Sequence, residues 1–181
     1  MRELSLHIMD IVENGLRAGA TLVEIFVKED RKGNWLSVEI SDNGHGMPDE
    51  TLKKVMDPFF STRSTRRVGL GLSMFRELCK RCDGEFDIKS KDGEGTKINA
   101  SFRIDHIDLI PLGDMAGSMM SLIMGNSEAD FLYTHEVDDR TFHLDTRQVR
   151  EELEGLEIYN PQVVKSLGKL VRESLADLME E

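Results

Sequence analysis

The chain has 181 residues, of which 34 are Asp or Glu and 23 are Lys or Arg, so its formal net charge is −11. This length allows one domain with an extension, or two small domains. The acidic balance excludes a general nucleic-acid surface, which needs a basic field to replace the counterions of phosphate. The sequence has no signal-peptide pattern and no apolar run of membrane-spanning length, so we expect a soluble, cytoplasmic protein without membrane contact.

The first elements in chain order are a helix, a β-hairpin and a short helix. Apolar residues at helical spacing over 4–18 predict the first helix. Residues 21–28 and 35–41 alternate in polarity and are rich in β-branched side chains, so they predict the two strands of a hairpin. A short helix is expected over 50–56, and a polar, Arg-rich loop over 61–68.

A further helix and hairpin follow. Helical periodicity covers residues 69–84, with Gly84 predicted as the C-terminal stop. Residues 85–90 and 96–104 predict two strands separated by the turn at 91–95. This order of elements predicts an α/β (α+β) two-layer sandwich, in which helices cover one face of a mixed β-sheet.

The character of the sequence changes after residue 104, where Gly-rich motifs end. We therefore predict a domain over 1–104 and a small α+β C-terminal appendage over 105–181. Its expected elements are a Met-rich helix over 112–124, a hairpin over 131–146 and two helices that begin after Asp145 and Asn160. Core packing is the favoured role of the Met-rich helix, and a dimer or partner contact is the alternative.

Polar residues recur every three or four positions on the first predicted helix. They are Glu3, His7, Asp10, Asn14 and Arg17. Asp10 and Asn14 lie four residues apart and therefore point at the same spot. A carboxylate there can activate water, and an amide oxygen can bind Mg²⁺. An ordinary solvated helix face accounts for the same pattern.

The sequence DNGHGM follows the second predicted strand, at residues 42–47. Its glycines are typical of a turn, because they adopt positive φ without steric cost. A functional interpretation is that Asp42 accepts a hydrogen bond from an adenine amino group, while Gly44 and Gly46 let the base lie against the backbone.

The sequence VGLGLS opens the helix that follows the Arg-rich loop. The free N–H groups of a helix start favour phosphate, so Gly69, Leu70 and Gly71 are candidate phosphate contacts. Arg63 and two further arginines precede them, and guanidinium groups suit phosphate oxygens. The segment is interpreted as a lid that closes on a polyphosphate, and a flexible surface loop is the alternative.

Together these motifs resemble the GHKL superfamily, the ATP-binding fold shared by DNA gyrase, the Hsp90 chaperones, sensor histidine kinases and the MutL mismatch-repair proteins. The resemblance covers about residues 1–104. It rests on the motifs VENGLRAGAT, DNGHGM, DPFFSTR, VGLGLS and GEGTKI, in that order. It implies a Bergerat-type ATP-binding fold, with ATP and Mg²⁺ as ligands.

The resemblance also implies a role for each matching residue. Asn14 is the expected Mg²⁺ ligand, Asp42 the adenine contact and Thr96 a second contact near adenine. Asp10 stands where the hydrolytic members have the longer Glu, so it is a candidate base only if the chain hydrolyses ATP. The remaining nucleotide contacts implied are Arg63 in the lid, Gly44 and Gly46 beside the base, and Gly69, Leu70 and Gly71 at the phosphates.

Three functions follow from the resemblance. The first is a histidine-kinase-like regulator that transfers phosphate to a partner protein. It would act in trans, since no helical segment with a phospho-accepting histidine precedes the domain and His7 is expected on a polar helix face. The second is a slow ATPase switch of the gyrase or MutL type, and the third is an ATP or ADP sensor without turnover. All three imply an unidentified protein partner, and a homodimer is a further expectation.

Two other patterns favour structural roles. Cys79 and Cys82 are expected to be buried, reduced thiols, because two cysteines cannot form a four-thiolate zinc site. His135 and His143 lie on the two strands of the C-terminal hairpin and are expected to be cross-strand neighbours. A solvent-facing pair is favoured over a metal site.

Overall fold

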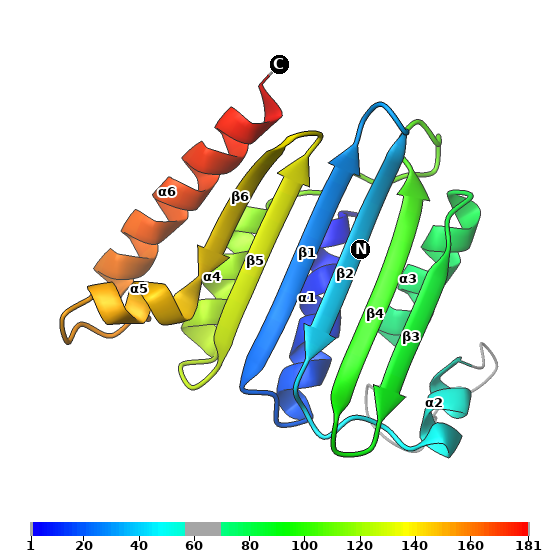
Figure 1. Ribbon diagram of the computed structural model, residues 1–181, viewed down its shortest axis with the longest axis horizontal. Coiled ribbons are helices and arrows are strands. Elements are labelled where there is room, and N and C mark those ends of the chain that lie inside the picture. The colour runs from blue at the N-terminus through cyan, green and yellow to red at the C-terminus, as the bar shows by residue number, and fades with distance from the viewer. Residues whose placement is uncertain (1, 57–69, 181) are drawn as a thin grey trace.

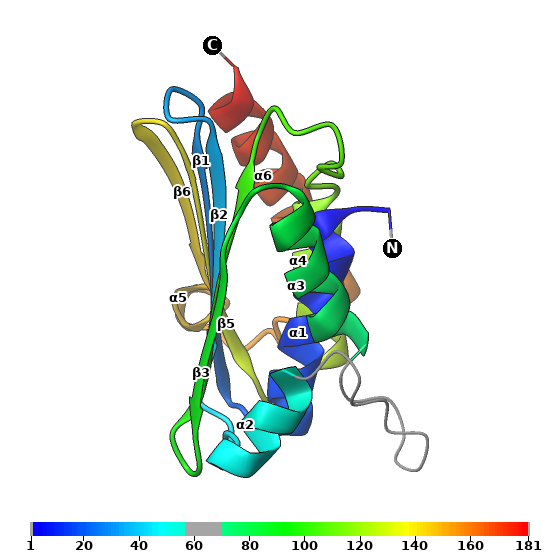
Figure 2. The same cartoon turned by 90° about the vertical axis from the view of Figure 1, so that its right-hand side faces the viewer.

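Six strands form one mixed sheet, and all the helices except the short α5 lie on one face of it, so the predicted two-layer sandwich is confirmed (Figures 1 and 2). The computed structural model describes residues 2–56 and 70–180, with the backbone alone at Met56 and Leu70. The elements are α1 (Leu4–Arg17), β1 (Leu22–Asp30), β2 (Trp35–Asp42), α2 (Asp49–Met56), α3 (Leu70–Arg81), β3 (Phe86–Lys91), β4 (Gly95–Arg103), α4 (Met115–Gly125), β5 (Asp130–Val137), β6 (Arg140–Asp145), α5 (Thr146–Glu152) and α6 (Pro161–Met179).

The strand order in the sheet is β3-β4-β2-β1-β5-β6. Both predicted hairpins of the N-terminal part are present, as β1 with β2 and β3 with β4, each pair antiparallel. Strand β2 also pairs with β4, and this register places Asp42 opposite Thr96. The ends of β2 and β4 that carry the predicted site residues therefore lie side by side. The Arg-rich loop over 61–68 lies outside the described residues.

The C-terminal residues extend the same sheet. Strand β5 pairs in parallel with β1, and β6 pairs with β5 to complete the predicted C-terminal hairpin. The first amides of α1, those of Leu4 and Ser5, donate to the carbonyl oxygens of Pro111 and Leu112. Buried side chains of β5 and α4 belong to the same hydrophobic core as those of α1 and β1. The boundary after residue 104 stays a prediction, while the two parts share one sheet and one core.

The two N-caps expected in the C-terminal part are confirmed. The Asp145 side chain accepts from the backbone N–H of Arg147, and the Asn160 side chain accepts from that of Gln162. The Met-rich helix α4 begins at Met115 rather than at 112, behind the Asp114 cap. Its core role is confirmed, since Met115, Met119 and Met120 are buried.

Helix α3 ends as predicted next to Gly84, but a different residue turns the chain. Asp83 adopts the left-handed conformation, with φ 53°. The N–H groups of Asp83 and Gly84 donate to the carbonyls of Lys80 and Cys79, which is the Schellman pattern of helix ends. Gly84 is needed for another reason, because a Cβ there would overlap the carbonyl oxygen of Ser101 on β4.

Within the described ranges, no helix has both the length and the apolar character needed to cross a membrane.

Replacing Gly84 by Ala tests this close approach of α3 to β4. We expect a loss of about 1–3 kcal/mol in the free energy of unfolding, because the added methyl displaces strand backbone rather than a flexible side chain. Gly125→Ala is the matched control, since a Cβ at the end of α4 meets nothing within 4 Å. Urea denaturation measures both variants, and an equal effect of the two substitutions would contradict the proposed contact.

Candidate functional site

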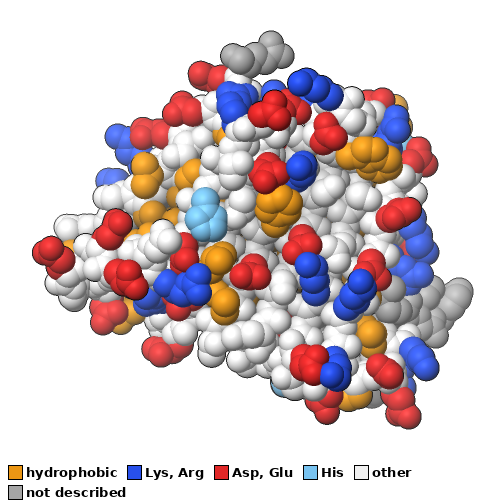
Figure 3. Space-filling model, viewed as in Figure 1, with side chains coloured by type: hydrophobic (Ala, Val, Ile, Leu, Met, Phe, Trp, Pro, Cys, Tyr) orange, Lys and Arg blue, Asp and Glu red, His pale blue; other side chains and the backbone are white. Residues whose placement is uncertain are grey.

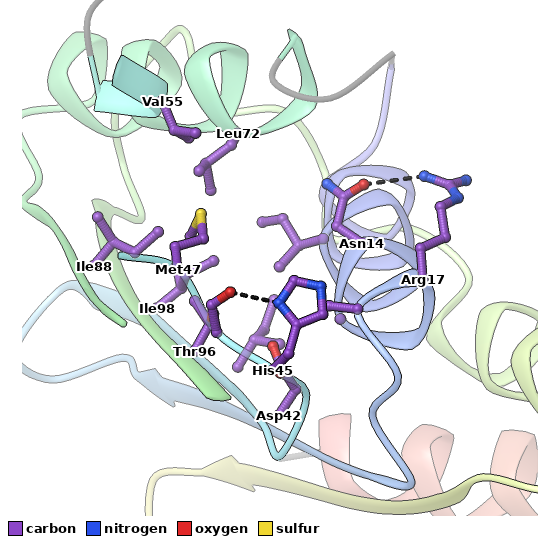
Figure 4. A pocket seen from close by; sticks show the side chains of 15 residues that line it. Asn14, Arg17, Asp42, His45, Met47, Val55, Leu72, Ile88, Thr96 and Ile98 are labelled. Carbon is purple, nitrogen blue, oxygen red and sulfur yellow. Dashed lines mark hydrogen bonds between the residues drawn. The ribbon is translucent and has the colours of Figure 1, made fainter. Parts of the chain in front are cut away.

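An open cavity of about 230 Å³ lies where α1, the end of β2 and the start of α3 meet (Figure 4). Apolar side chains from six elements and one loop form most of its walls. They are Ile11, Ile40, Met47, Val55, Leu72, Ile88 and Ile98. The polar side chains are few, and Asn14, Arg17, Asp42, His45 and Thr96 supply them. A mainly apolar slot with a few polar groups is the usual form of a small-ligand site.

Asp42 places a carboxylate in this apolar slot. Its Oδ1 accepts from the backbone N–H of Gly44 at 2.9 Å, and the backbone N–H of Thr96 also donates to the carboxylate. Burial raises the pKa of Asp42, while these two donors and the neighbouring His45 oppose the shift. A half-buried carboxylate with unused acceptor capacity favours a ligand that donates a hydrogen bond to it.

Glycines surround the Asp42 carboxylate, and one of them was missed by sequence analysis. A Cβ on Gly15 of α1 would lie 2.8 Å from Asp42 Oδ2, and one on Gly44 would lie 2.9 Å from Oδ1. A glycine inside a helix costs about 1 kcal/mol relative to alanine, and that cost is the sequence signal for Gly15. Both glycines give the carboxylate room, and Gly44 does not line the cavity itself.

Gly46 holds the turn after β2 against the turn between β3 and β4. It has φ 67°, and a Cβ there would overlap the carbonyl oxygen of Lys91. Ser90 strengthens the same junction, since its hydroxyl accepts from the N–H of Met47 at 2.8 Å and lies 2.9 Å from the Thr96 hydroxyl. Thr96 and Gly46 therefore line the cavity from one rigid corner of the sheet.

Asn14 and Asp10 project from α1 but differ in surroundings. Asn14 lines the cavity, and its Oδ1 accepts from the Arg17 guanidinium at 3.0 Å (Figure 4). Arg17 is held in turn by Glu13, at 2.6 Å. Asp10 does not line the cavity; its carboxylate lies against Gly71 in the first turn of α3, where a Cβ would overlap it.

The structure thus brings together Asn14, Asp42, Gly46 and Thr96 around one cavity, with Leu72 beside the start of α3. Arg63 and Gly69 lie outside the described residues, and the Leu70 side chain is not described. Within residues 2–56 and 70–180, no group of three His, Cys, Asp or Glu side chains is arranged to hold a metal ion.

Two predictions about histidines are wrong. His7 is 3% exposed and stacks on Phe75, with the ring centroids 5.7 Å apart, so the stripe on α1 is interrupted by a core residue. Burial lowers its pKa. His135 is 1% exposed, between the Tyr133 hydroxyl and the Glu29 carboxylate, whereas the exposed His143 contacts Thr134. The β5–β6 register pairs His143 with Thr134, which places the two histidines on opposite faces of the sheet.

Residues 2–106 match the family described as "Histidine kinase-, DNA gyrase B-, and HSP90-like ATPase". The chain belongs to this family. Membership implies that the domain is of the type that binds ATP or ADP, and the chain carries the family's histidine-kinase-like ATPase domain.

Relatives in sequence include a "Putative sensor protein" of Shewanella frigidimarina, 34% identical over 59% of this chain, and "Sporulation kinase C" of Bacillus subtilis, 31% identical over 52%. The match covers only 17% and 22% of the lengths of these proteins. A solved structure of the Aquifex aeolicus MutL ATPase domain complexed with ADP resembles 85% of this chain, with a TM-score of 0.55 and 16% identity. It covers 68% of that chain, and at this identity the likeness shows the fold alone.

Asp42→Asn separates ligand recognition from stability. The raised pKa of Asp42 means that the folded state favours the protonated carboxyl group. Above that pKa the ionised carboxylate therefore lowers the stability of the fold, and an uncharged amide removes this cost. We expect ATP affinity to fall about 10- to 100-fold, the value of a hydrogen bond to a charged group, with a melting temperature equal or higher. Calorimetric titration and thermal melts measure both, with the exposed Asp92→Asn as control. A variant that lost stability together with binding would contradict this account.

The two cysteines are buried and free, as predicted. Burial raises the pKa of the Cys79 thiol to about 12, so very little thiolate forms near neutral pH. We expect a thiol reagent at pH 8 to label both cysteines far more slowly in the native protein than after unfolding in urea. Native labelling as fast as that of the unfolded chain would contradict the burial.

Proposed function

We propose that this protein binds ATP with Mg²⁺ and acts as a regulator that transfers the γ-phosphoryl group to a side chain of a partner protein. The observation that carries the proposal is the apolar slot with the Asp42 carboxylate inside it and Asn14 on its wall, in a chain of the histidine-kinase-like ATPase family.

The slot suits a flat base with an exocyclic amino group. Ile40, Ile88 and Ile98 offer an apolar surface to a ring, and the Asp42 carboxylate offers an acceptor to its amino hydrogens. A base that presents a carbonyl oxygen instead would leave the carboxylate unpaired and repelled. Such a mismatch makes a half-buried carboxylate selective.

The residues present also fit a Mg²⁺–phosphate group. Mg²⁺ keeps several waters and takes only one or two protein ligands beside phosphate oxygens, so the single amide oxygen of Asn14 suffices. Bound Mg²⁺ would neutralise phosphate charge. Asn14 Oδ1 accepts from Arg17, so to hold the metal this oxygen would have to give up the guanidinium. The Arg17 guanidinium would then be able to bind phosphate oxygens.

Transfer to a partner needs little chemistry from this chain. The bond between the γ-phosphorus and its bridging oxygen breaks, a bond to the partner's nucleophile forms, and ADP leaves. Positioning and charge stabilisation supply most of the catalysis in such reactions. Two features support transfer over hydrolysis: the relatives named as a sensor protein and a kinase, and the placing of Asp10 outside the cavity.

A slow ATPase switch is the second candidate, and one observation favours it. The Asp10 carboxylate touches the first turn of α3, next to the helix start where phosphate is expected. A carboxylate in that place can take a proton from an attacking water. The same contact also lets it stabilise the positive end of α3 without any chemical role.

Variants at Asn14 and Asp10 distinguish the two functions. With [γ-³²P]ATP, Mg²⁺ and an extract of the organism of origin, we expect acid-labile label on a partner protein. Asn14→Ala should abolish it, whereas Asp10→Asn should retain it within about threefold, since no proton need be removed by this group. Phosphate release that depends on Asp10, with no labelled protein, would instead establish the ATPase. Absence of ATP binding at millimolar nucleotide would refute both functions.

A further inference from the structure

An apolar groove lies between α5 and α6, at the β6 end of the sheet and outside the residues that match the ATPase family. Its volume is about 410 Å³, larger than that of the nucleotide cavity. The apolar side chains that line it are Val149, Leu153, Leu156, Val163, Leu167 and Leu170. Leu156 and Leu170 are 59% and 58% exposed, and nearby Tyr159 is 41% exposed. Exposed large apolar groups gathered in one groove mark an interaction surface.

Carboxylates outnumber cations beside the groove, where the exposed lysines are Lys165 and Lys169 of α6, and Lys169 pairs with Glu173. Four exposed carboxylates lie at the end of α5 and in the segment after it, those of Glu151, Glu152, Glu154 and Glu157. None of them forms an ion pair with any residue in 2–56 or 70–180. The two arginines of α5 are engaged elsewhere, Arg147 with Asp145 and Arg150 with Asp130. Figure 3 shows Asp and Glu side chains gathered at this end of the molecule, beside hydrophobic side chains.

The carboxylates argue against a second copy of this chain as the occupant. In a two-fold dimer the same patch meets itself, so a symmetric contact here would bring two sets of carboxylates together. Like charges opposed across an interface cost several kcal/mol. The net charge of −11 adds a long-range repulsion between copies. A partner with basic side chains avoids this repulsion, because its positive charges are attracted to the carboxylates.

The length of the groove's apolar face matches that of a helical ligand. On its α6 side, Val163, Leu167 and Leu170 present one apolar face over seven residues, or about 10 Å at the helical rise. An amphipathic helix with apolar residues at i, i+3, i+4 and i+7 covers about the same length. Lys or Arg on its flanks would meet the four carboxylates.

We propose that the α5–α6 groove binds an amphipathic, basic helix of a partner protein. The groove connects to the nucleotide cavity through packed helices, since α6 contacts α4 and α4 contacts α1, which carries Asn14. Binding of the helix does not require the nucleotide chemistry, so a negative result for ATP binding would not contradict it.

A labelled synthetic helix of about 15 residues, with Leu at i, i+3, i+4 and i+7 and Lys elsewhere, is the probe. We expect it to bind the full chain saturably in fluorescence anisotropy. A peptide of the same composition with the leucines scrambled, and one with Glu in place of Lys, should bind at least tenfold more weakly, because the first loses the apolar face and the second the charge match.

Variants of the groove locate the binding. Leu156→Glu with Leu170→Glu should weaken it at least tenfold, because central apolar contacts dominate such interfaces. Ile107→Glu with Met124→Glu is the matched control, since both residues are exposed and lie outside the groove. Replacing the four glutamates by glutamine should weaken binding of the peptide and reduce the salt dependence of that binding, because the charge attraction is lost. The charge-matched control places amides at Glu85, Asp87, Asp92 and Glu94, around the opposite edge strand β3.

Three results would overturn the proposal: no saturable binding of the Leu/Lys helix, binding unchanged by the two groove substitutions, or binding that the control substitutions weaken equally. Light scattering tests whether a second copy of this chain occupies the groove instead. A dimer of the intact chain that becomes a monomer in Leu170→Glu would assign the groove to that second copy. Circular dichroism confirms that each variant is folded.

Discussion

The Asp42 carboxylate, held in an apolar slot, is the constraint on which the site depends. Its position requires Gly15 on α1 and Gly44 after β2, since a methyl group at either would press on its oxygens. It also requires the register that sets Asp42 opposite Thr96, because the Thr96 N–H donates to it. The sheet register and the sequence of α1 thus both accommodate one desolvated carboxylate. A hydrogen-bond donor on a ligand would offset the free-energy cost of that desolvation.

Helix α1 connects this constraint to the rest of the fold. One face buries Leu4, Ile8 and Val12 against the sheet, while Asn14 and Gly15 at its far end shape the cavity. Its first amides are satisfied by carbonyls of Pro111 and Leu112, so the C-terminal part completes the helix that carries the site. Contacts of α1 with both α3 and α4 place it between α3 and the C-terminal helices.

Local patterns in the sequence predicted much of this, because periodicity and turn chemistry act over a few residues. The hairpins, the end of α3 next to Gly84 and the caps at Asp145 and Asn160 are of this kind. The failures are long-range: burial of His7 depends on Phe75, and that of His135 depends on the β5–β1 pairing, which no local pattern specifies. Gly15 was missed for the same reason, because its role appears only when Asp42 approaches from another element.

The selectivity of the slot tests the central claim most directly. Calorimetric titration of the intact chain with ATP and with GTP, both with Mg²⁺, compares bases that differ in the group facing Asp42. Guanine presents a carbonyl oxygen where adenine presents an amino group, so this account predicts that GTP binds about 100-fold more weakly or not at all. Equal affinities for the two nucleotides would contradict it.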